Sequence, residues 1–392
     1  MTNFSRAKWR DAKLADLVFF QRGFDITQAQ QRPGPYPVVS SSGITSHHDE
    51  FKAVGPGVII GRKGTLGEVH FCASDYWPHD TTLWSKDLRA NNPRFVYYFL
   101  HTIDFQRFDV GNSNPTLNRN HIHDLSIRIP DPPIQEAIAD ILSAYDDLIE
   151  KNRRRMALLE KAARLLYEEW FVRLRFPGHE HTRTLGGIPE RWSWLPLESV
   201  CLDREGIQTG PFGSQLHQSD YSDDGVPVVM PKNLISFRIA DEEVSRIPES
   251  LAQKLSRHRM IDGDTVYGRR GDIGRRAFVS ARQAGWICGT GCLRIRPDPE
   301  SINPRFLFDA LGSPETAGTI ANRAKGSTML NLNSSVLKSV PVLVAPRRLQ
   351  DLYSDQVEPM AHLVELLSEQ SQKLRAARDL LLPRLISGEI TV

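Results

Sequence analysis

Two glycine-bounded turns carry paired cations, and they are the segments of this sequence best suited to bind a polyanion. Gly61-Arg62-Lys63-Gly64-Thr65 recurs later in the chain as Gly268-Arg269-Arg270-Gly271. Glycines let backbone amides approach a phosphate closely, and the cationic side chains can reach a phosphate or a guanine edge. A plain β-turn with solvated charges explains a single copy equally well. The recurrence favours the binding interpretation.

Two polar loops, residues 111–118 and 325–333, offer the amide and hydroxyl groups that base recognition uses. Their candidate binding residues are Asn112, Asn114, Thr116, Asn118 and the adjoining Arg119 in the first loop, and Lys325, Ser327, Thr328 and Asn331 in the second. The same side chains could instead cap turns and the elements that follow them. For Asn118 and Asn331 both interpretations stay open.

Motifs for catalysis within the chain are missing. Asp131-Pro132-Pro133-Ile134 looks like an amino-methyltransferase motif up to its last position, where isoleucine cannot stack on a flipped base. A helix start already explains these residues. No dinucleotide-binding glycine motif after a strand, phosphate-binding P-loop or nucleophile elbow is present. The sequence therefore predicts no catalytic residues and no cofactor in this chain.

A metal site is also not expected. Candidate ligands occur as His179-Glu180-His181, His121-x-His123 and Cys288-x-x-x-Cys292, but none completes a four-ligand set at zinc spacing. Exposed loop histidines and small buried thiols explain them.

The composition is that of an ordinary globular protein. The chain has 392 residues, which predicts two or three domains, and its 49 basic and 47 acidic residues give a net charge of only +2. Any nucleic-acid surface must therefore be local. With 40% apolar and 24% charged residues, and no apolar run of about 20 residues, disorder and a membrane protein are excluded. Met1 to Lys13 lacks a signal peptide, and four cysteines cannot form a disulfide framework, so a cytoplasmic location is expected.

An internal repeat organises the chain. The matching segments, in order, are Trp9/Leu14/Leu17 with Trp192/Leu197/Val200, Gly61–Gly64 with Gly268–Gly271, Asn92-Pro93-Arg94-Phe95 with Asn303-Pro304-Arg305-Phe306, Leu117–Asn120 with Leu330–Asn333, and Pro133–Glu136 with Arg348–Asp351. A larger gap in the second copy places an insertion between its tryptophan and its glycine-rich turn. We infer two homologous halves, each a mixed domain followed by a helix.

The helix of the first half should run from Ile134 to Phe171, 38 residues or roughly 57 Å. A coiled-coil stripe is predicted at Ile134, Ile138, Ile141, Tyr145, Leu148, Asn152, Arg155, Leu159, Ala162 and Leu166. The second stripe is predicted at Met360, Leu363, Leu367, Gln370, Leu374, Ala377 and Leu381, with an interruption expected at Pro359. Antiparallel pairing of the helices would place two domains at opposite ends of a rod about a pseudo-twofold axis. Packing of each helix on its own domain is the alternative.

The predicted fold class is α+β, with two homologous mixed α/β domains separated by two long helices that form an antiparallel coiled coil. The expected boundaries are residues 1–133 for the first domain, 134–176 for the central helix, 177–345 for the second domain and 346–392 for the C-terminal helix. Short β-branched runs such as Gly57–Ile60, Val226–Val229 and Val340–Val344 are typical of strands in such domains.

Several segments carry a family resemblance that covers essentially the whole chain. They are Asn152–Arg155 through Glu168–Phe171, Arg175–Glu180, the ending Leu381–Ile390, Trp77–Trp84 and Gln208–Leu216. With these motifs the chain resembles the specificity subunits of type I restriction-modification systems. The resemblance implies two target recognition domains, each reading one half of a bipartite asymmetric DNA site, with the paired helices acting as a ruler.

The resemblance also implies partners. These are double-stranded DNA, two methylation subunits on the helical region, and restriction subunits that join the complex; no membrane is involved. S-adenosylmethionine, ATP and Mg²⁺ would belong to those partners, and this chain would be non-catalytic. A self-contained methyltransferase or nuclease, or a two-headed scaffold with no DNA role, are the alternatives.

The remaining candidate residues follow from the matched loops and helices. Candidates for DNA contact are Ser41, Ser42, Arg62, Lys63, Thr65, His79, Asp80, Thr81 and Thr82 in the first domain, and Gln208, Thr209, Phe212, Ser214, Gln215, Lys232, Asn233, Arg269, Arg270 and Thr290 in the second. Candidates for contact with partner subunits are Arg153, Arg154, Arg155, Tyr167, Trp170, Phe171 and Arg384.

Overall fold

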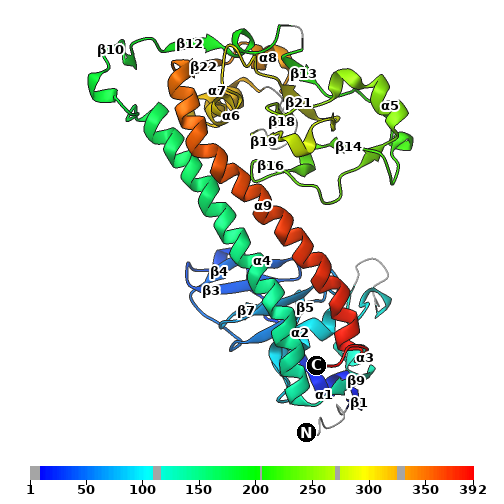
Figure 1. Cartoon of the computed structure of the whole chain (residues 1–392). Helices are drawn as coiled ribbons and strands as arrows, with labels where there is room; N and C mark the ends of the chain where they lie inside the picture. The colour runs from blue at the N-terminus through cyan, green and yellow to red at the C-terminus, as the bar shows by residue number, and fades with distance from the viewer. Residues whose placement is uncertain (1–8, 109–115, 204, 270–273, 325–331) are drawn as a thin grey trace, which may run out of the picture. The chain divides into compact units, whose positions relative to one another are not determined.

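The computed structural model describes residues 9–108, 116–203, 205–269, 274–324 and 332–392. The chain divides into two compact units: unit 1 is Met1–Arg154 with Leu367–Val392, and unit 2 is Arg155–Leu366. Two long helices, α4 (Pro132–Tyr167) and α9 (Arg347–Ile386), contribute one part to each unit (Figure 1). Each unit therefore consists of an α+β domain and the adjoining parts of both helices.

The domain of unit 1 is built on three small sheets. Strand β1 (Trp9–Lys13) pairs antiparallel with β9 (Ser126–Pro130). A four-stranded antiparallel sheet has the order β2 (Phe19–Arg22), β8 (Thr82–Asp87), β5 (Gly57–Gly61), β6 (Val69–Cys72), and a three-stranded sheet has the order β4 (Gly43–His48), β3 (Tyr36–Ser40), β7 (Trp77–Pro78). Its short helices are α1 (Leu14–Leu17), α2 (Pro93–His101) and α3 (Arg119–His123).

Unit 2 repeats this topology strand for strand. Strand β12 (Ser193–Pro196) pairs antiparallel with β22 (Pro341–Val344). The four-stranded sheet has the order β13 (Ile207–Thr209), β21 (Cys292–Ile295), β18 (Thr265–Gly268), β19 (Arg276–Phe278), and the three-stranded sheet has the order β17 (Arg246–Ile247), β14 (Val226–Val229), β20 (Ile287–Cys288). In both units the three-stranded sheet joins one antiparallel and one parallel pair. The predicted repeat and α+β class are thus confirmed within each unit.

Unit 2 also contains elements without a counterpart in unit 1. Three of them, β15 (Leu234–Ile235), β16 (Arg238–Ile239) and α5 (Glu249–Lys254), lie between β14 and β18. This is the place where the sequence predicted an insertion. Of the helices that follow the sheet, α6 (Pro304–Ala310) and α8 (Ser334–Lys338) correspond to α2 and α3, whereas α7 (Pro314–Arg323) is additional. A small additional hairpin, β10 (Thr184–Leu185) with β11 (Ile188–Pro189), precedes the sheet.

The repeated Asn-Pro-Arg-Phe segments start equivalent helices. Asn92 accepts hydrogen bonds from the backbone N–H groups of Arg94 and Phe95 at the start of α2. Asn303 accepts the same two bonds at the start of α6. Asparagine at this position satisfies N–H groups that the helix itself cannot, and proline follows without loss because its missing N–H is not needed there.

A buried glutamine fixes the first turn of each long helix to its own domain. The side-chain oxygen of Gln135 accepts from the Asn92 N–H at 3.0 Å, and its amide nitrogen donates to the Pro130 carbonyl at 3.0 Å. Gln350 makes the same two contacts, with the Asn303 N–H at 2.8 Å and the Ala345 carbonyl at 2.7 Å. Both glutamines are 1% exposed. The repeated Gln in the sequence is therefore structural.

One predicted repeat match has the wrong register. Asn118 caps α3 by accepting from the Asn120 N–H, and the residue that caps α8 in the same way is Asn333, not Asn331. Backbone contacts agree, since the N–H of Leu117 donates to the Arg62 carbonyl and that of Leu332 donates to the Arg269 carbonyl. Two extra residues in the second loop hid this alignment. For Asn118 the capping interpretation is confirmed.

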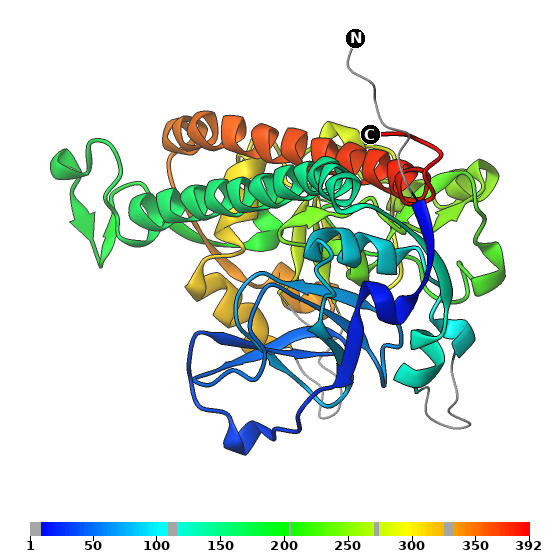
Figure 2. The same cartoon turned by 90° about the horizontal axis from the view of Figure 1, so that it is seen from below.

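The helix segments of unit 1 run antiparallel and side by side (Figures 1 and 2). Asn152 donates to Gln370 Oε1 at 3.0 Å and to Ser371 Oγ at 3.3 Å, while Asp146 pairs with Arg378 further along both helices. In unit 2 the two helices also meet, where the Tyr353 hydroxyl donates to the Ala163 carbonyl at 3.4 Å.

The predicted stripe on α4 is wrong by about one position along much of its length. Ile138 and Leu142 are buried, but Ile141 is 36% and Leu148 is 45% exposed, and Arg155 is exposed as well. Polar residues with hydrogen-bond partners, among them Gln135, Ser143 and Asn152, occupy the buried face. An apolar pattern alone cannot locate a face that hydrogen-bonded polar groups share.

Proline does not interrupt the second long helix, contrary to the prediction. Helix α9 runs through Pro359 from Arg347 to Ile386. Pro359 and Asp355, the residue whose carbonyl loses its helical partner, are both exposed. Water can therefore satisfy that carbonyl, so the proline costs less here than on a buried face.

Both long helices end against a tryptophan of the repeat. Helix α4 continues into a π-helical turn, Glu168–Val172, whose Phe171 ring lies 5.7 Å from Trp192. Beyond α9, a Cβ added at Gly388 would lie 2.9 Å from Trp9, so only glycine fits at this left-handed position without a shift. None of the helices among the described residues combines the length and apolar composition needed to cross a membrane.

We expect Gln350→Leu to lower the stability of unit 2 by about 1–3 kcal/mol, because it leaves a buried N–H and a buried carbonyl without partners. For a unit of this size, each kcal/mol of lost stability lowers the Tm by roughly 2–4 °C. Differential scanning calorimetry measures it. The exposed Gln356 on the same helix provides the control, Gln356→Leu, which should leave the Tm nearly unchanged; equal melting of both variants would contradict the role of Gln350.

Candidate functional site

The turn at residues 61–65 of unit 1 is shaped by its backbone. The N–H groups of Arg62 and Lys63 donate to the Thr81 carbonyl at 2.8 and 3.1 Å, and Gly64 has a φ of +78°. Glycine adopts this left-handed conformation without steric cost. The side chains of Lys63 and Thr65 are exposed, and Arg62 is half-buried. The turn therefore presents polar side chains on a fixed backbone.

The second turn is anchored in the same way. The Arg269 N–H donates to the Gly291 carbonyl at 2.9 Å. The Arg269 guanidinium lies 5.9 Å from the ring of Phe212, whose side chain is 54% exposed. The ring face turned away from the cation is suited to stack on a nucleic-acid base.

A polar hollow in unit 1 brings several predicted residues together. Its lining residues are Gln21, Arg22, Gly23, Phe24, Asp25, Arg62, Asp80, Leu83, Thr116, Leu117, Asn118 and Arg119. Five of them, Arg62, Asp80, Thr116, Asn118 and Arg119, were sequence-derived candidates. They come from three loops that the sheet order places at one end of the domain.

The hollow carries three guanidinium groups and two carboxylates. Arg22 Nη2 pairs with Asp80 Oδ2 at 2.7 Å. Burial lowers the pKa of Arg62, the neighbouring Arg22 lowers it further, and Asp80 opposes both. Among the described residues, Nη1 of Arg62 is buried with no hydrogen-bond partner. This arrangement can bind an oxyanion or the hydrogen-bond acceptors of a nucleobase edge. It does not pair a nucleophile with a general base.

Sequence reasoning missed Gln21 and Arg22, although a signal for them existed. Gln21-Arg22-Gly23 in unit 1 matches Gln208-Thr209-Gly210 in unit 2, and only the second copy was predicted. Both glycines let a neighbouring backbone carbonyl approach closely. A Cβ added at Gly23 would lie 2.1 Å from the carbonyl oxygen of His79, and one added at Gly210 would lie 2.0 Å from that of Gly289.

Hydroxyl and imidazole groups next to the hollow form a local network. His79 Nδ1 lies 3.0 Å from Thr81 Oγ1, which accepts from the Ser41 N–H at 3.3 Å. Ser42 is exposed. Thr82 was predicted as a contact residue, but its side chain is fully buried and donates to the His79 carbonyl at 2.6 Å. Thr82 shapes the turn and cannot reach a ligand in this conformation.

Unit 2 holds several of its candidates in β13 and the loop that follows it. Gln208 Oε1 accepts from Arg294 Nη2 at 3.1 Å, and Thr290 Oγ1 donates to the Pro211 carbonyl at 2.9 Å. Ser214 is exposed, and Gln215 Oε1 accepts from the Phe212 N–H at 3.2 Å. Thr209 is half-buried on β13 beside Gln208.

Asn233 is a wrong prediction for direct contact. It is 3% exposed, and its Oδ1 accepts from the Met230 N–H at 2.9 Å, so it closes a turn. The neighbouring Lys232 is exposed.

A buried arginine behind the second site was not predicted. Arg294 is 1% exposed and donates to the carbonyls of Arg257, Arg259 and Glu205 as well as to Gln208. Burial lowers the pKa of Arg294, and Arg296 lowers it further. Because backbone carbonyls take most of its donors, Arg294 positions Gln208 and does not face solvent itself.

The candidate arginines of the long helices are exposed. On α4, Arg153 and Arg154 pair with Glu150 at 2.6 and 2.7 Å, and these guanidinium groups lower the pKa of Glu150 to about 2. Arg155 is exposed. On α9, Arg384 pairs with Glu389 at 2.8 Å. Such exposed pairs contribute little stability and remain available to a partner.

The aromatic candidates at the end of α4 mostly face inward. Tyr167 is 7% and Phe171 is 4% exposed, and both pack in the core of unit 2 with Tyr353. Trp170 is half-buried. The prediction that Tyr167 and Phe171 contact a partner is therefore wrong for this conformation, because the domain of unit 2 already covers them.

Metal ligands are sparse among the residues that the structure describes. One group, Asp25, His79 and Asp80, has its ligand atoms within 4.8 Å of one another, but Arg22 already pairs with Asp80. Burial raises the pKa of Cys288 to about 12 and that of Cys292 well above its ordinary value, so both are thiols rather than thiolate ligands.

Seven candidates lie outside the described residues. These are Asn112, Asn114, Arg270, Lys325, Ser327, Thr328 and Asn331.

Comparison with known proteins places these features in context. Residues 7–161 match the family model of the type I restriction modification DNA specificity domain. The MjaIX specificity subunit of a type I restriction enzyme from Methanocaldococcus jannaschii is 22% identical over 306 residues, which cover 76% of this chain and 69% of that protein. The MjaVIII specificity subunit from the same organism is 24% identical over 283 residues, 68% of this chain and 63% of that protein.

A solved structure shares the fold. The S subunit of the type I restriction-modification system from M. genitalium superposes with a TM-score of 0.64 at 16% identity, over 98% of each chain. At that identity the likeness shows the fold alone.

Proposed function

We propose, from the premise that this chain belongs to the type I restriction-modification specificity subunits, that it is the non-catalytic subunit that reads double-stranded DNA for such a complex. The observation that carries the proposal is the repeat of one domain topology, with a polar, glycine-shaped site at the same place in each copy. Two such domains in one chain suit a bipartite site.

Each domain would read a different half-site. The equivalent strands carry different side chains, since Gln21-Arg22 in unit 1 corresponds to Gln208-Thr209 in unit 2. In unit 1 the hollow offers Arg22, Arg62 and Asp80, which suit guanine and cytosine edges or phosphates. In unit 2 the exposed Phe212 ring beside Arg269 offers stacking instead. The proposed site is therefore asymmetric.

The long helices would set the spacing of the half-sites and bind two methylation subunits. The exposed arginines Arg153, Arg154 and Arg155 of α4 and Arg384 of α9 are the proposed contacts. Restriction subunits would join this assembly. S-adenosylmethionine, ATP and Mg²⁺ would act in those partners.

The first test is methylome sequencing of a host that expresses this chain with its neighbouring methylation subunit, against the same host with the chain deleted. We expect a bipartite motif that disappears on deletion, because sequence reading resides in this chain. Methyl transfer by the purified chain alone would contradict the non-catalytic assignment. A chain that shows no preference between the motif and a random duplex would leave only a scaffold role.

A second prediction concerns the turn at residues 61–65. Lys63→Gln should weaken binding to all duplexes and reduce the slope of log affinity against log salt by about 0.9, because one phosphate contact is lost. Fluorescence anisotropy over a salt series measures both the affinity and its salt dependence. Lys86→Gln removes an equally exposed lysine from β8 and is the control. Equal slopes for the two variants would show that Lys63 does not touch phosphate.

The ruler proposal makes a third prediction. Deleting the facing heptads 146–152 of α4 and 372–378 of α9 removes about 10.5 Å of helix, or about three base pairs of DNA length. The methylome should then show a spacer shorter by about three base pairs with both half-sites unchanged. An unchanged spacer would refute the ruler.

A further inference from the structure

A buried guanidinium in unit 2 forms no direct ion pair with a described carboxylate, although the negative charge of Asp309 acts on it. Arg276 on β19 is 7% exposed, and its Nε donates to the Phe308 carbonyl at 3.1 Å. Its group lies 4.8 Å from the ring of Phe237 and 5.0 Å from that of Phe308. Among the described residues, no carboxylate lies within 4.0 Å of it, and its Nη1 and Nη2 groups have no hydrogen-bond acceptor.

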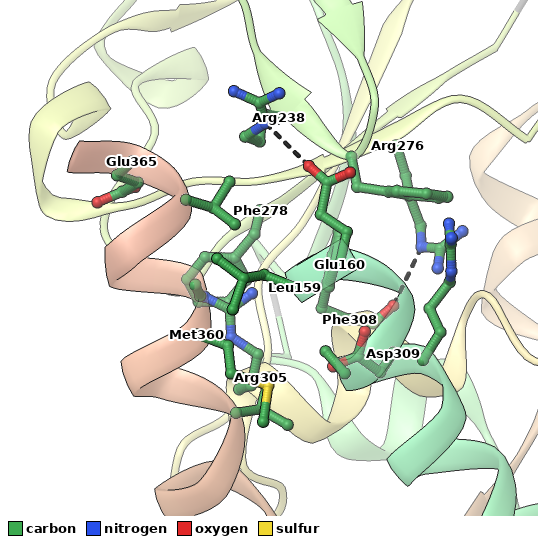
Figure 3. A pocket seen from close by; sticks show the side chains of 16 residues that line it. Leu159, Glu160, Arg238, Arg276, Phe278, Arg305, Phe308, Asp309, Met360 and Glu365 are labelled. Atoms are coloured by element: carbon green, nitrogen blue, oxygen red, sulfur yellow. Dashed lines mark hydrogen bonds and ion pairs between the residues drawn. The ribbon is translucent and has the colours of Figure 1, made fainter. Parts of the chain in front are cut away.

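Aromatic rings cannot replace those acceptors. The rings attract the cation through their faces, but the N–H groups of a guanidinium lie in its plane and require acceptors at its edge. Figure 3 shows Arg276 beside Phe308, with a dashed line from its guanidinium and Asp309 nearby. Burial lowers the pKa of Arg276, and the nearby charge of Asp309 offsets this effect only in part.

The guanidinium of Arg276 packs against the turn between α6 and α7. A Cβ added at Gly312 would lie 1.6 Å from Arg276 Nη2, so glycine is needed to admit the group. Arg276 and Gly312 line a common hollow, together with Ser313 at the start of α7. The Arg276 side chain therefore borders this hollow beside Gly312.

Two further cations line the same hollow from α4. Lys161 and Arg164 are both exposed, and neither forms an ion pair within 4.0 Å with a described carboxylate. The carboxylates of the hollow have other partners, since Glu168 lies 3.6 Å from Arg173 and Asp309 accepts from the Tyr353 hydroxyl at 2.9 Å. Three cations from two elements thus converge beside two carboxylates that are already engaged.

We propose that this hollow, formed by Arg276, Lys161, Arg164 and the Gly312–Ser313 turn, is a binding site for a small tetrahedral oxyanion of the phosphate class. The ligand would accept from the in-plane N–H groups of Arg276 and tie α4 to the turn before α7. Arginine and lysine together bind such anions through a planar fork and a point charge. The site is independent of DNA reading.

Isothermal titration of the full chain with inorganic phosphate tests the proposal, in chloride buffer of matched ionic strength. We expect saturable binding at one site, at least about tenfold weaker in the double variant Lys161→Gln/Arg164→Gln. Saturating phosphate should also raise the Tm of the chain, since a ligand that binds only the folded state stabilises it. Acetate should bind more weakly than phosphate, because a planar carboxylate offers fewer acceptor oxygens.

The control is Lys254→Gln/Arg257→Gln, which removes two exposed cations elsewhere in unit 2 and should bind phosphate as the unaltered chain does. Arg276→Gln should abolish binding; if that variant fails to fold, the Lys161/Arg164 pair decides. Absence of saturable binding, or equal affinity of the pocket and control variants, would overturn the site. Equal affinity for acetate would overturn its assignment to the phosphate class.

Discussion

A buried glutamine amide at the first turn of each long helix is the contact on which the arrangement inside each unit depends. Gln135 joins the end of β9, the start of α2 and the start of α4, and it also donates to Asn91 Oδ1 at 2.8 Å. Asn91 in turn donates to the Leu17 carbonyl at 2.9 Å. Buried amides of this kind tolerate only one geometry, because an unmade bond costs about 1–3 kcal/mol. The helix consequently leaves its domain at a fixed point.

That constraint also explains what the sequence could and could not predict. Repeated motifs located the two homologous halves and their long helices, because glycine, asparagine and proline act locally. The buried face of α4 was misplaced because Gln135 and Ser143 are inside for their hydrogen bonds, which hydropathy does not record. In the site, the glycine turns were found, but Thr82 and Asn233 are buried and close turns with His79 and Met230, and Tyr167 packs against the sequence-distant Tyr353. Arg22 was overlooked because its importance depends on Asp80, which only the folded sheet brings near.

The two units show how one backbone can hold different chemistry. Strand pairing makes Trp84 of unit 1 equivalent to Arg294 of unit 2, since each faces the same position of the central strand. The same reasoning aligns Val69 with Arg276. An arginine over a phenylalanine is kept in both, as Arg94 over Phe71 and Arg305 over Phe278. The two units thus share the arginine–phenylalanine contact beside the long helices. The side chains in the interior behind each site differ between them.

The discontinuous composition of unit 1 has a consequence for biosynthesis. Unit 2 is one uninterrupted stretch, Arg155–Leu366, and its core can close as soon as that stretch has emerged from the ribosome. Unit 1 needs Leu385 and Ile386 in its core, and both follow the whole of unit 2 in the chain. Although its domain precedes unit 2, the core of unit 1 is therefore completed after that of unit 2, and part of its apolar surface stays open until α9 has been synthesised. A chain truncated before α9 would expose that surface permanently.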